Sequence, residues 1–165
     1  MSDWSRYYLN IAQEVAKNSK CFSRHVGAVL VRNNTIIASG YNGPAKGIRT
    51  CAEWKKVEGW PIDNLELICP RRQEGYKSGE GLNICPAVHG ERNTLLSAAI
   101  NGIATKDSTL YAYCGVPCKD CCSELINAGV SKIVCLKMKE DYDSYGRLYL
   151  KEAKVELVEV ECKEK

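Results

Sequence analysis

The sequence lacks any long apolar run that could cross a membrane. None of its stretches approaches the roughly 18 consecutive apolar residues that a membrane-spanning helix needs. Residues 1–6 are polar and do not form the apolar core of a secretion signal. We therefore expect a cytoplasmic protein with no membrane partner.

An excess of charge of one sign is also absent. Lys and Arg number 23 against 20 Asp and Glu, a net charge of +3, and Phe22 is the single phenylalanine. A groove for a polynucleotide usually combines a basic surface with aromatic side chains on which bases stack. The composition thus argues against polymeric nucleic acid as a partner. A small anionic ligand, which needs only one or two cations, stays open.

Cysteine, in contrast, is abundant, with ten residues in 165. A chain of this length can bury a core of its own, and without an export signal a secreted disulfide scaffold is disfavoured. In a reducing compartment, clustered cysteines are more often metal ligands or catalytic groups. The cysteine content therefore indicates zinc.

The hydrophobic pattern predicts an α/β fold. Apolar residues at helical spacing predict a helix over about 5–15, and Asn33-Asn34 joins two β-rich runs, 26–31 and 35–39, as a hairpin. Residues 40–44 are expected to form a loop. Helices are then expected at about 90–101, 118–128 and 144–153, alternating with strands at about 108–113, 131–136 and 155–160. This alternation predicts a three-layer α/β/α sandwich with a mixed five-stranded sheet.

We expect residues 1–165 to form a single domain. A long, irregular, cysteine-containing insertion at about 50–86 interrupts it, with too little apolar sequence for a core of its own. Such a segment in a compact domain is usually functional or held in place by something else.

Two short motifs carry the predicted chemistry. Cys118 and Cys121 lie three apart in the first turn of an expected helix, where they share one face and where thiolate is favoured. His89 and Glu91 stand at the start of another helix, so both side chains can reach one point. One imidazole and two thiolates leave the fourth position of zinc to water, which is typical of a catalytic site. Glu91 would then accept the proton of the activated water and pass it to the substrate.

Other interpretations of these motifs exist. A Cys-x-x-Cys pair alone also occurs as a redox pair, as half of a structural zinc site or as two buried thiols. Cys122 could reach a metal in place of Cys121, although we favour Cys121.

Together, His89-x-Glu91 and Pro117-Cys118-x-x-Cys121 resemble the zinc motif of the cytidine deaminase superfamily. Over residues 5–160 the chain is further similar to the deoxycytidylate (dCMP) deaminase family. The similar segments are Ser19-Lys20-Cys21, Val26-Gly27-Ala28, Ser39-Gly40-Tyr41-Asn42-Gly43, Asn93 and Asn127-Ala128-Gly129-Val130. The resemblance implies a cytidine deaminase-like fold and zinc-dependent hydrolysis of dCMP to dUMP and ammonia, feeding thymidylate synthesis.

The resemblance also implies binding roles. Asn42, Asn93 and Arg24 would contact the substrate, and Gly40, Tyr41, Asn42 and Gly43 would bind a dCTP- or dTTP-type effector, with Mg²⁺ on its triphosphate. It further implies a homohexamer and leaves open a phage-encoded protein acting in the host cytoplasm. Alternatives are a plain surface charge for Arg24 and a simple turn for residues 40–43.

Two departures from the family pattern concern the substrate pocket. Gly90 stands where the family usually has Ala, and the segment 113–116 is one residue longer than usual. A modified or differently phosphorylated cytosine nucleotide, or a nucleoside, therefore remains open as the substrate. A non-catalytic zinc nucleotide-binding module is a further alternative, but Glu91 would have no use in it.

A second, structural zinc is predicted in the insertion. Cys21 and Cys51 match positions that look like structural-zinc ligands in phage relatives, and Cys69 and Cys85 are each followed by Pro. A closed four-cysteine site would hold the insertion and contribute folding energy. The alternative is four separate buried thiols. Of the other cysteines we expect two in the core and one exposed: Cys114 and Cys135, and Cys162.

Overall fold

The computed structural model describes residues 3–57, 69–77, 79–140 and 143–161. Its helices are α1 (Trp4–Ala16), α2 (Cys51–Val57), α4 (Pro70–Gln73), α5 (Gly90–Ile100), α6 (Lys119–Asn127) and α7 (Tyr145–Glu152), with a 3-10 turn η1 (Leu82–Ile84). Its strands are β1 (Gly27–Arg32), β2 (Thr35–Tyr41), β3 (Gly43–Pro44), β4 (Ala87–Val88), β5 (Thr109–Ala112), β6 (Lys132–Leu136) and β7 (Glu156–Val160). None of the described helices is both long and apolar enough to cross a membrane.

The main sheet has five strands in the order β2-β1-β5-β6-β7. Strand β1 is antiparallel to β2 and β5, whereas β5, β6 and β7 are parallel. Asn33 and Asn34, at φ 50° and 58°, form the turn between β1 and β2, and two left-handed residues match the twist of a hairpin. The predicted mixed five-stranded sheet is confirmed.

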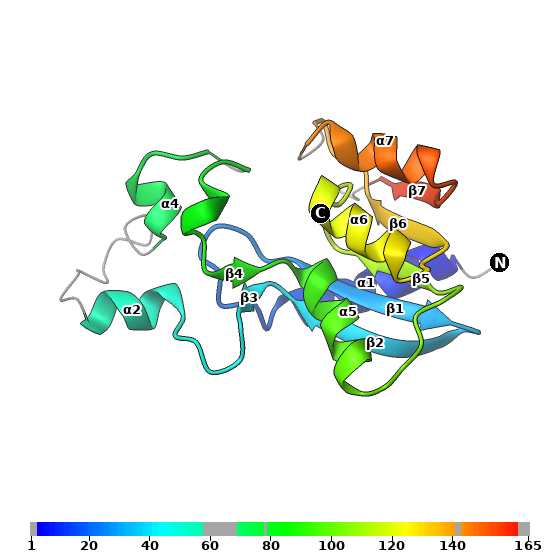
Figure 1. The fold of residues 1–165 in the computed structure, drawn as a ribbon, viewed down its shortest axis with the longest axis horizontal. Helices are drawn as coiled ribbons and strands as arrows, with labels where there is room; N and C mark the ends of the chain where they lie inside the picture. Colours follow the sequence, from blue (N-terminus) through cyan, green and yellow to red (C-terminus); the bar gives the residue numbers. More distant parts are fainter. Residues whose placement is uncertain (1–2, 58–68, 78, 141–142, 162–165) are drawn as a thin grey trace.

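Helices cover both faces of this sheet (Figure 1). Helix α1 packs on one face, where Leu9 and Ala12 meet Val29 and Val134. The opposite face is covered by α5, α6 and α7, which contribute Ala98, Leu125 and Leu150 to a second cluster of buried residues. The predicted three-layer α/β/α arrangement is therefore confirmed.

The loop predicted at residues 40–44 is wrong. Gly40 and Tyr41 complete β2, and Gly43–Pro44 form β3, which pairs antiparallel with β4 (Ala87–Val88). A Cβ on Gly40 would lie 2.4 Å from the backbone nitrogen of Thr94 in α5. Glycine here permits close packing of strand on helix instead of a turn, and the β3–β4 pair fixes the segment that leads into the site.

The insertion is more regular than expected where it is described. It contains α2, α4 and η1, which lie beyond β3 and β4 in Figure 1. Residues 58–68 of the insertion, and Cys162, lie outside the described residues. That residues 1–165 form one domain stays a prediction.

Candidate metal centre and active site

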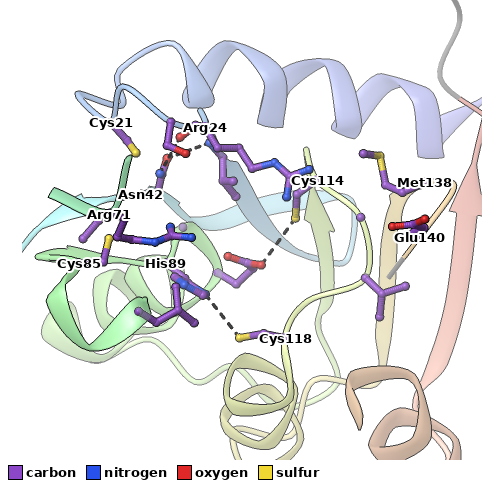
Figure 2. Close-up of a pocket in the computed structure, with 18 residues that line it drawn as sticks. Cys21, Arg24, Asn42, Arg71, Cys85, His89, Cys114, Cys118, Met138 and Glu140 are labelled. Atoms are coloured by element: carbon purple, nitrogen blue, oxygen red, sulfur yellow. Dashed lines mark hydrogen bonds between the residues drawn. The ribbon is translucent and has the colours of Figure 1, made fainter. Parts of the chain in front are cut away.

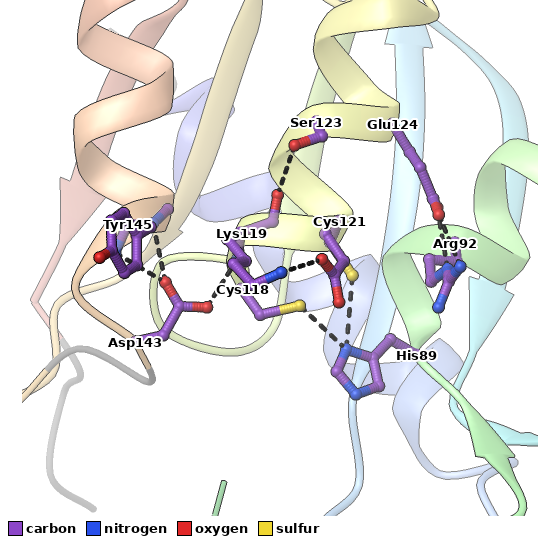
Figure 3. A network of polar contacts seen from close by, with 11 residues as sticks. His89, Arg92, Cys118, Lys119, Cys121, Ser123, Glu124, Asp143 and Tyr145 are labelled. Carbon is purple, nitrogen blue, oxygen red and sulfur yellow. Dashed lines mark hydrogen bonds and ion pairs between the residues drawn. The ribbon is translucent and has the colours of Figure 1, made fainter. Parts of the chain in front are cut away.

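The starts of helices α5 and α6 place the predicted metal ligands. His89 precedes α5 and Cys118 precedes α6, and both have extended backbone angles, with ψ of 151° and 164°. Each therefore stands outside the regular helical turns, and Figure 2 shows their side chains directed toward each other. Cys121, in the first turn of α6, joins them (Figure 3).

These three side chains converge on one point. The sulfurs of Cys118 and Cys121 each lie 3.4 Å from Nδ1 of His89. Within the described part of the chain, this is the only group of three or more His, Cys, Asp or Glu side chains whose ligand atoms all lie within 4.8 Å of one another. Tetrahedral zinc, with bonds of about 2.0–2.3 Å, separates its ligand atoms by about 3.5–3.8 Å. The three residues fit a zinc ion and leave one position open.

The pKa values of the two cysteine thiols, Cys118 and Cys121, also suit a metal site. The pKa of Cys118 is lowered to about 4, mainly by a hydrogen bond from the Cys121 thiol and also by His89. The pKa of Cys121 is raised, because its thiol donates that bond and because it is buried. The lowered pKa favours the thiolate form of Cys118, the form that binds zinc.

The geometry favours Cys121 over Cys122 as the metal ligand. The Cys122 thiol donates to the carbonyl oxygen of Pro117 at 3.2 Å and belongs to the core under the sheet. Burial raises its pKa to about 12. Of the two neighbours, Cys121 is the one whose sulfur lies beside His89.

Glu91 follows His89 by two residues and is only 4% exposed. Burial raises the pKa of its carboxyl group. Its Oε1 accepts a hydrogen bond from the thiol of Cys114 at 3.6 Å, the dashed line at Cys114 in Figure 2. The pKa of Cys114 is raised well above its usual value by burial, so this thiol keeps its proton and remains a donor.

A cavity of about 290 Å³ opens beside the metal ligands, and Glu91, His89 and Cys118 contribute to its wall. This volume is near the lower end of the range for small-molecule sites. A buried carboxyl group with a raised pKa, next to metal ligands in such a cavity, is the arrangement expected of a general acid and base.

Comparison with known proteins agrees with the geometry. Residues 2–137 match the family model described as the cytidine and deoxycytidylate deaminase zinc-binding region. The chain belongs to this family. It is 32% identical over 143 residues to the deoxycytidylate deaminase of Enterobacteria phage T2, covering 76% of both chains. It is also 32% identical over 155 residues to the deoxycytidylate deaminase of Schizosaccharomyces pombe, covering 93% of this chain but only 43% of that protein's length.

Solved structures confirm the fold. The dCMP deaminase of cyanophage S-TIM5, in complex with dCMP and dUMP, has a TM-score of 0.71 at 24% identity and covers 97% of this chain and 99% of that one. The cytidine deaminase-like sandwich predicted for this family member is therefore correct.

Two of the residues predicted to bind substrate line the cavity, Asn42 and Arg24. The side chain of Asn42 is 7% exposed. Its Oδ1 accepts from the backbone nitrogen of Val26, and its Nδ2 donates to the carbonyl oxygen of Arg24, both at 2.8 Å. Asn42 therefore fixes the backbone from which Arg24 projects, and direct contact with substrate stays a prediction for both.

Asn93 is placed differently. Its Nδ2 donates to the carbonyl oxygen of Tyr41 at 2.8 Å, and it is not among the residues that line the cavity. Tyr41 itself is 42% exposed. A substrate role for Asn93, and an effector role for the segment from Gly40 to Gly43, stay predictions.

Gly90 does not provide free space for a larger base. A Cβ at this position would lie 3.0 Å from the carbonyl oxygen of Val26 and 3.3 Å from the backbone nitrogen of Asn42. A methyl group at this position would make tight contacts with these neighbours, which would have to move by a few tenths of an ångström to admit it.

The four cysteines of the predicted second zinc site lie near one another. The pKa of Cys51 is raised to about 11, first by burial and then by Cys69, Cys85 and Cys21. Cys69 is buried directly before α4, and Cys21 and Cys85 line the same cavity as the active-site group. The four sulfur atoms nevertheless do not all lie within 4.8 Å of one another, whereas the ligand atoms of His89, Cys118 and Cys121 do.

Sequence reasoning missed two residues of the site. Cys114 packs against the core as expected, but its thiol also contacts Glu91, and the longer 113–116 segment was the one signal of this. Arg71, within the insertion, lines the cavity, and nothing in its neighbourhood distinguished it from the adjacent Arg72.

Proposed function

We propose that this protein is a zinc-dependent hydrolytic deaminase that converts dCMP to dUMP and ammonia. The observation that carries the proposal is the convergence of His89, Cys118 and Cys121 beside the buried carboxyl group of Glu91. A purely structural zinc site would be closed by a fourth protein ligand and would have no use for an acid and base next to it. The family of the chain and the substrate named for its relatives agree with this activity.

The roles of the residues follow from their positions. His89, Cys118 and Cys121 would hold the zinc, which when bound supplies a Lewis acid able to activate water at neutral pH. Glu91 takes one proton from the attacking water and delivers it to the ring nitrogen. It then takes the second proton of that water, from the hydroxyl group that has added to the ring carbon, and gives it to the departing amine. The amino group leaves as ammonia, and the oxygen from water becomes the carbonyl of uracil. The raised pKa of Glu91 favours a group that both takes and gives a proton.

The substrate is tested by a panel of dCMP, dCTP, CMP, deoxycytidine and 5-substituted dCMP on the zinc-loaded protein. We expect dCMP to have the highest kcat/KM, with dUMP and ammonia released in equal amounts. Equal turnover of deoxycytidine would indicate a nucleoside deaminase. Tight binding of dCMP without ammonia release would indicate a binding module.

A second zinc, held by Cys21, Cys51, Cys69 and Cys85, is proposed for the insertion. Its support is the pKa of Cys51, which is raised to about 11 first by burial and then by the nearby thiols of Cys69, Cys85 and Cys21. Metal analysis should then give two zinc ions per chain, one in Cys69→Ser and two in the control Cys122→Ser. One zinc per chain in the parent, unchanged in Cys69→Ser, would remove this site.

Self-association is proposed through the apolar surface of α5. Leu96 and Ile100, one turn apart, are 58% and 82% exposed, and exposed apolar patches of this kind mark interaction sites. We expect this surface to take part in a hexamer. Sedimentation of the parent and of Ile100→Lys tests the assembly; a monomeric parent would contradict it.

An effector site is proposed at residues 40–43, where we expect the Mg²⁺ complex of dCTP or dTTP to bind. Activity against dCMP with and without the triphosphate tests the effector.

A reducing cytoplasm suits these roles. All nine cysteines among the described residues are free thiols, the form that metal binding requires. Relatives encoded by phages are consistent with a protein that acts in a host cytoplasm.

A further inference from the structure

A second arginine, Arg71, enters the active-site cavity from the insertion. It belongs to the short helix α4, directly after Cys69-Pro70, and is only 8% exposed. Its side chain lines the cavity shared by His89 and Glu91. In Figure 2 its guanidinium group points into this cavity.

Among the described residues, backbone carbonyl groups hold the guanidinium group of Arg71. Its Nε donates to the carbonyl oxygen of Glu80, and its Nη2 donates to the carbonyl oxygen of Lys77 at 2.9 Å. Across the described ranges, no carboxylate forms an ion pair with it. Carbonyl dipoles fix its position but do not neutralise its positive charge, and a charge that is buried without an ion-pair partner from the described part of the chain is a costly arrangement. An anion that enters the cavity would supply that counter-charge.

Arg24 reaches the same cavity from a different part of the chain, the segment before β1. The Nδ2 of Asn42 holds the backbone of Arg24 at 2.8 Å. The two arginines thus come from separate elements. Hydrogen bonds fix the backbone of Arg24 and the side chain of Arg71, and Figure 2 shows both side chains directed into the cavity. Arginine is the side chain best suited to bind a phosphate through two parallel hydrogen bonds.

We propose that Arg71 binds the 5′-phosphate of the substrate, together with Arg24, and so makes the enzyme select a nucleotide over a nucleoside. This inference rests on the proposed deaminase function and assigns its specificity to a residue of the insertion. The insertion therefore supplies one wall of the substrate site. Arg71 acts on binding, while Glu91 and the metal ligands carry the chemistry.

The matched pair Arg71→Gln and Arg72→Gln tests this role. Arg72 is the next residue of α4, is exposed and does not line the cavity. In Arg71→Gln, the ratio of kcat/KM for dCMP to that for deoxycytidine should fall by about 10- to 100-fold, the value of a charge-assisted hydrogen bond to phosphate. The loss should appear mainly in KM. Arg72→Gln should keep the ratio of the parent.

Inhibition provides an independent measurement. The inhibition constant of dUMP should rise in Arg71→Gln by a factor similar to that of KM, while that of deoxyuridine should not. If Arg71→Gln does not fold, Arg71→Lys decides, with a smaller loss that is again confined to the phosphorylated ligands. An unchanged ratio, or an equal loss with dCMP and deoxycytidine, overturns the proposal. A parent enzyme that deaminates neither compound would instead overturn the proposed function.

Discussion

The thiol of Cys114 lies 3.6 Å from Oε1 of Glu91 and donates a hydrogen bond to it. This contact orients the carboxyl group that is expected to move the protons of the reaction. Cys114 comes from the segment after β5 and Glu91 from α5, so the bond also joins two elements of the site. We infer that Cys114 is a positioning residue.

Loss of this contact should lower turnover more than binding. In Cys114→Ala we expect kcat for dCMP to fall by about 2- to 10-fold, the value of one hydrogen bond, with KM little changed. Cys114→Ser, which keeps a donor, should recover most of the activity. Steady-state kinetics of the three proteins make the comparison. A larger effect on KM than on kcat, or no recovery in the serine variant, would show that Cys114 is only packing.

Replacement of neighbouring cysteines should separate a metal ligand from a core thiol. Cys121→Ser should lose one zinc per chain, because the Cys121 sulfur lies 3.4 Å from His89 Nδ1. Cys122→Ser should keep its zinc, because the Cys122 thiol bonds to the Pro117 carbonyl instead. Elemental analysis of both purified variants gives the answer. Zinc loss in Cys122→Ser alone would reverse the assignment.

The side-chain amide of Asn42 should contribute strongly to stability. Asn42→Ala would leave the backbone nitrogen of Val26 and the carbonyl oxygen of Arg24 without their partner. We expect the free energy of unfolding to fall by about 1–3 kcal/mol, as measured by denaturant titration. The control Asn101→Ala, which removes one exposed bond to the Ser97 carbonyl, should have a much smaller effect. Equal effects of the two substitutions would contradict this role.

Tyr111 should make the protein less stable in alkali. Burial, and then Tyr8 and Glu156, raise the pKa of Tyr111 above its ordinary value near 10. Both the folded and the unfolded chain hold the phenolic proton below about pH 10, so stability is unaffected there. At higher pH the unfolded chain releases the proton first, and stability falls as the pH rises through the folded pKa. Unfolding at pH 8 and about pH 11 should show a smaller decline in Tyr111→Phe than in the parent; identical declines would contradict this.

Much of the fold could be predicted because its signals are local. The spacing of apolar residues predicted α1. The Asn33-Asn34 pair predicted the hairpin, since two residues with positive φ suit that turn. The metal group was predictable for the same reason. His89 and Cys118 each stand at a helix start, which short motifs reveal.

The rest depends on contacts between distant segments. Gly40 resembled a turn residue, but its role is close packing against Thr94 in α5, which no neighbour in the sequence indicates. Arg71 and Arg72 are equivalent in the sequence, and only tertiary packing buries the first of them. Residues whose role is set by packing across the chain could not be distinguished in advance.

The most direct test of the whole account is the Glu91→Gln variant, measured for zinc and for turnover of dCMP together. Glutamine keeps the shape of the side chain but cannot shuttle a proton, so the variant should hold as much zinc as the parent. Its kcat should fall by about 10²- to 10⁴-fold, the usual contribution of a general acid and base. A variant that releases ammonia from dCMP as fast as the parent would contradict the assignment of Glu91 as the catalytic acid and base.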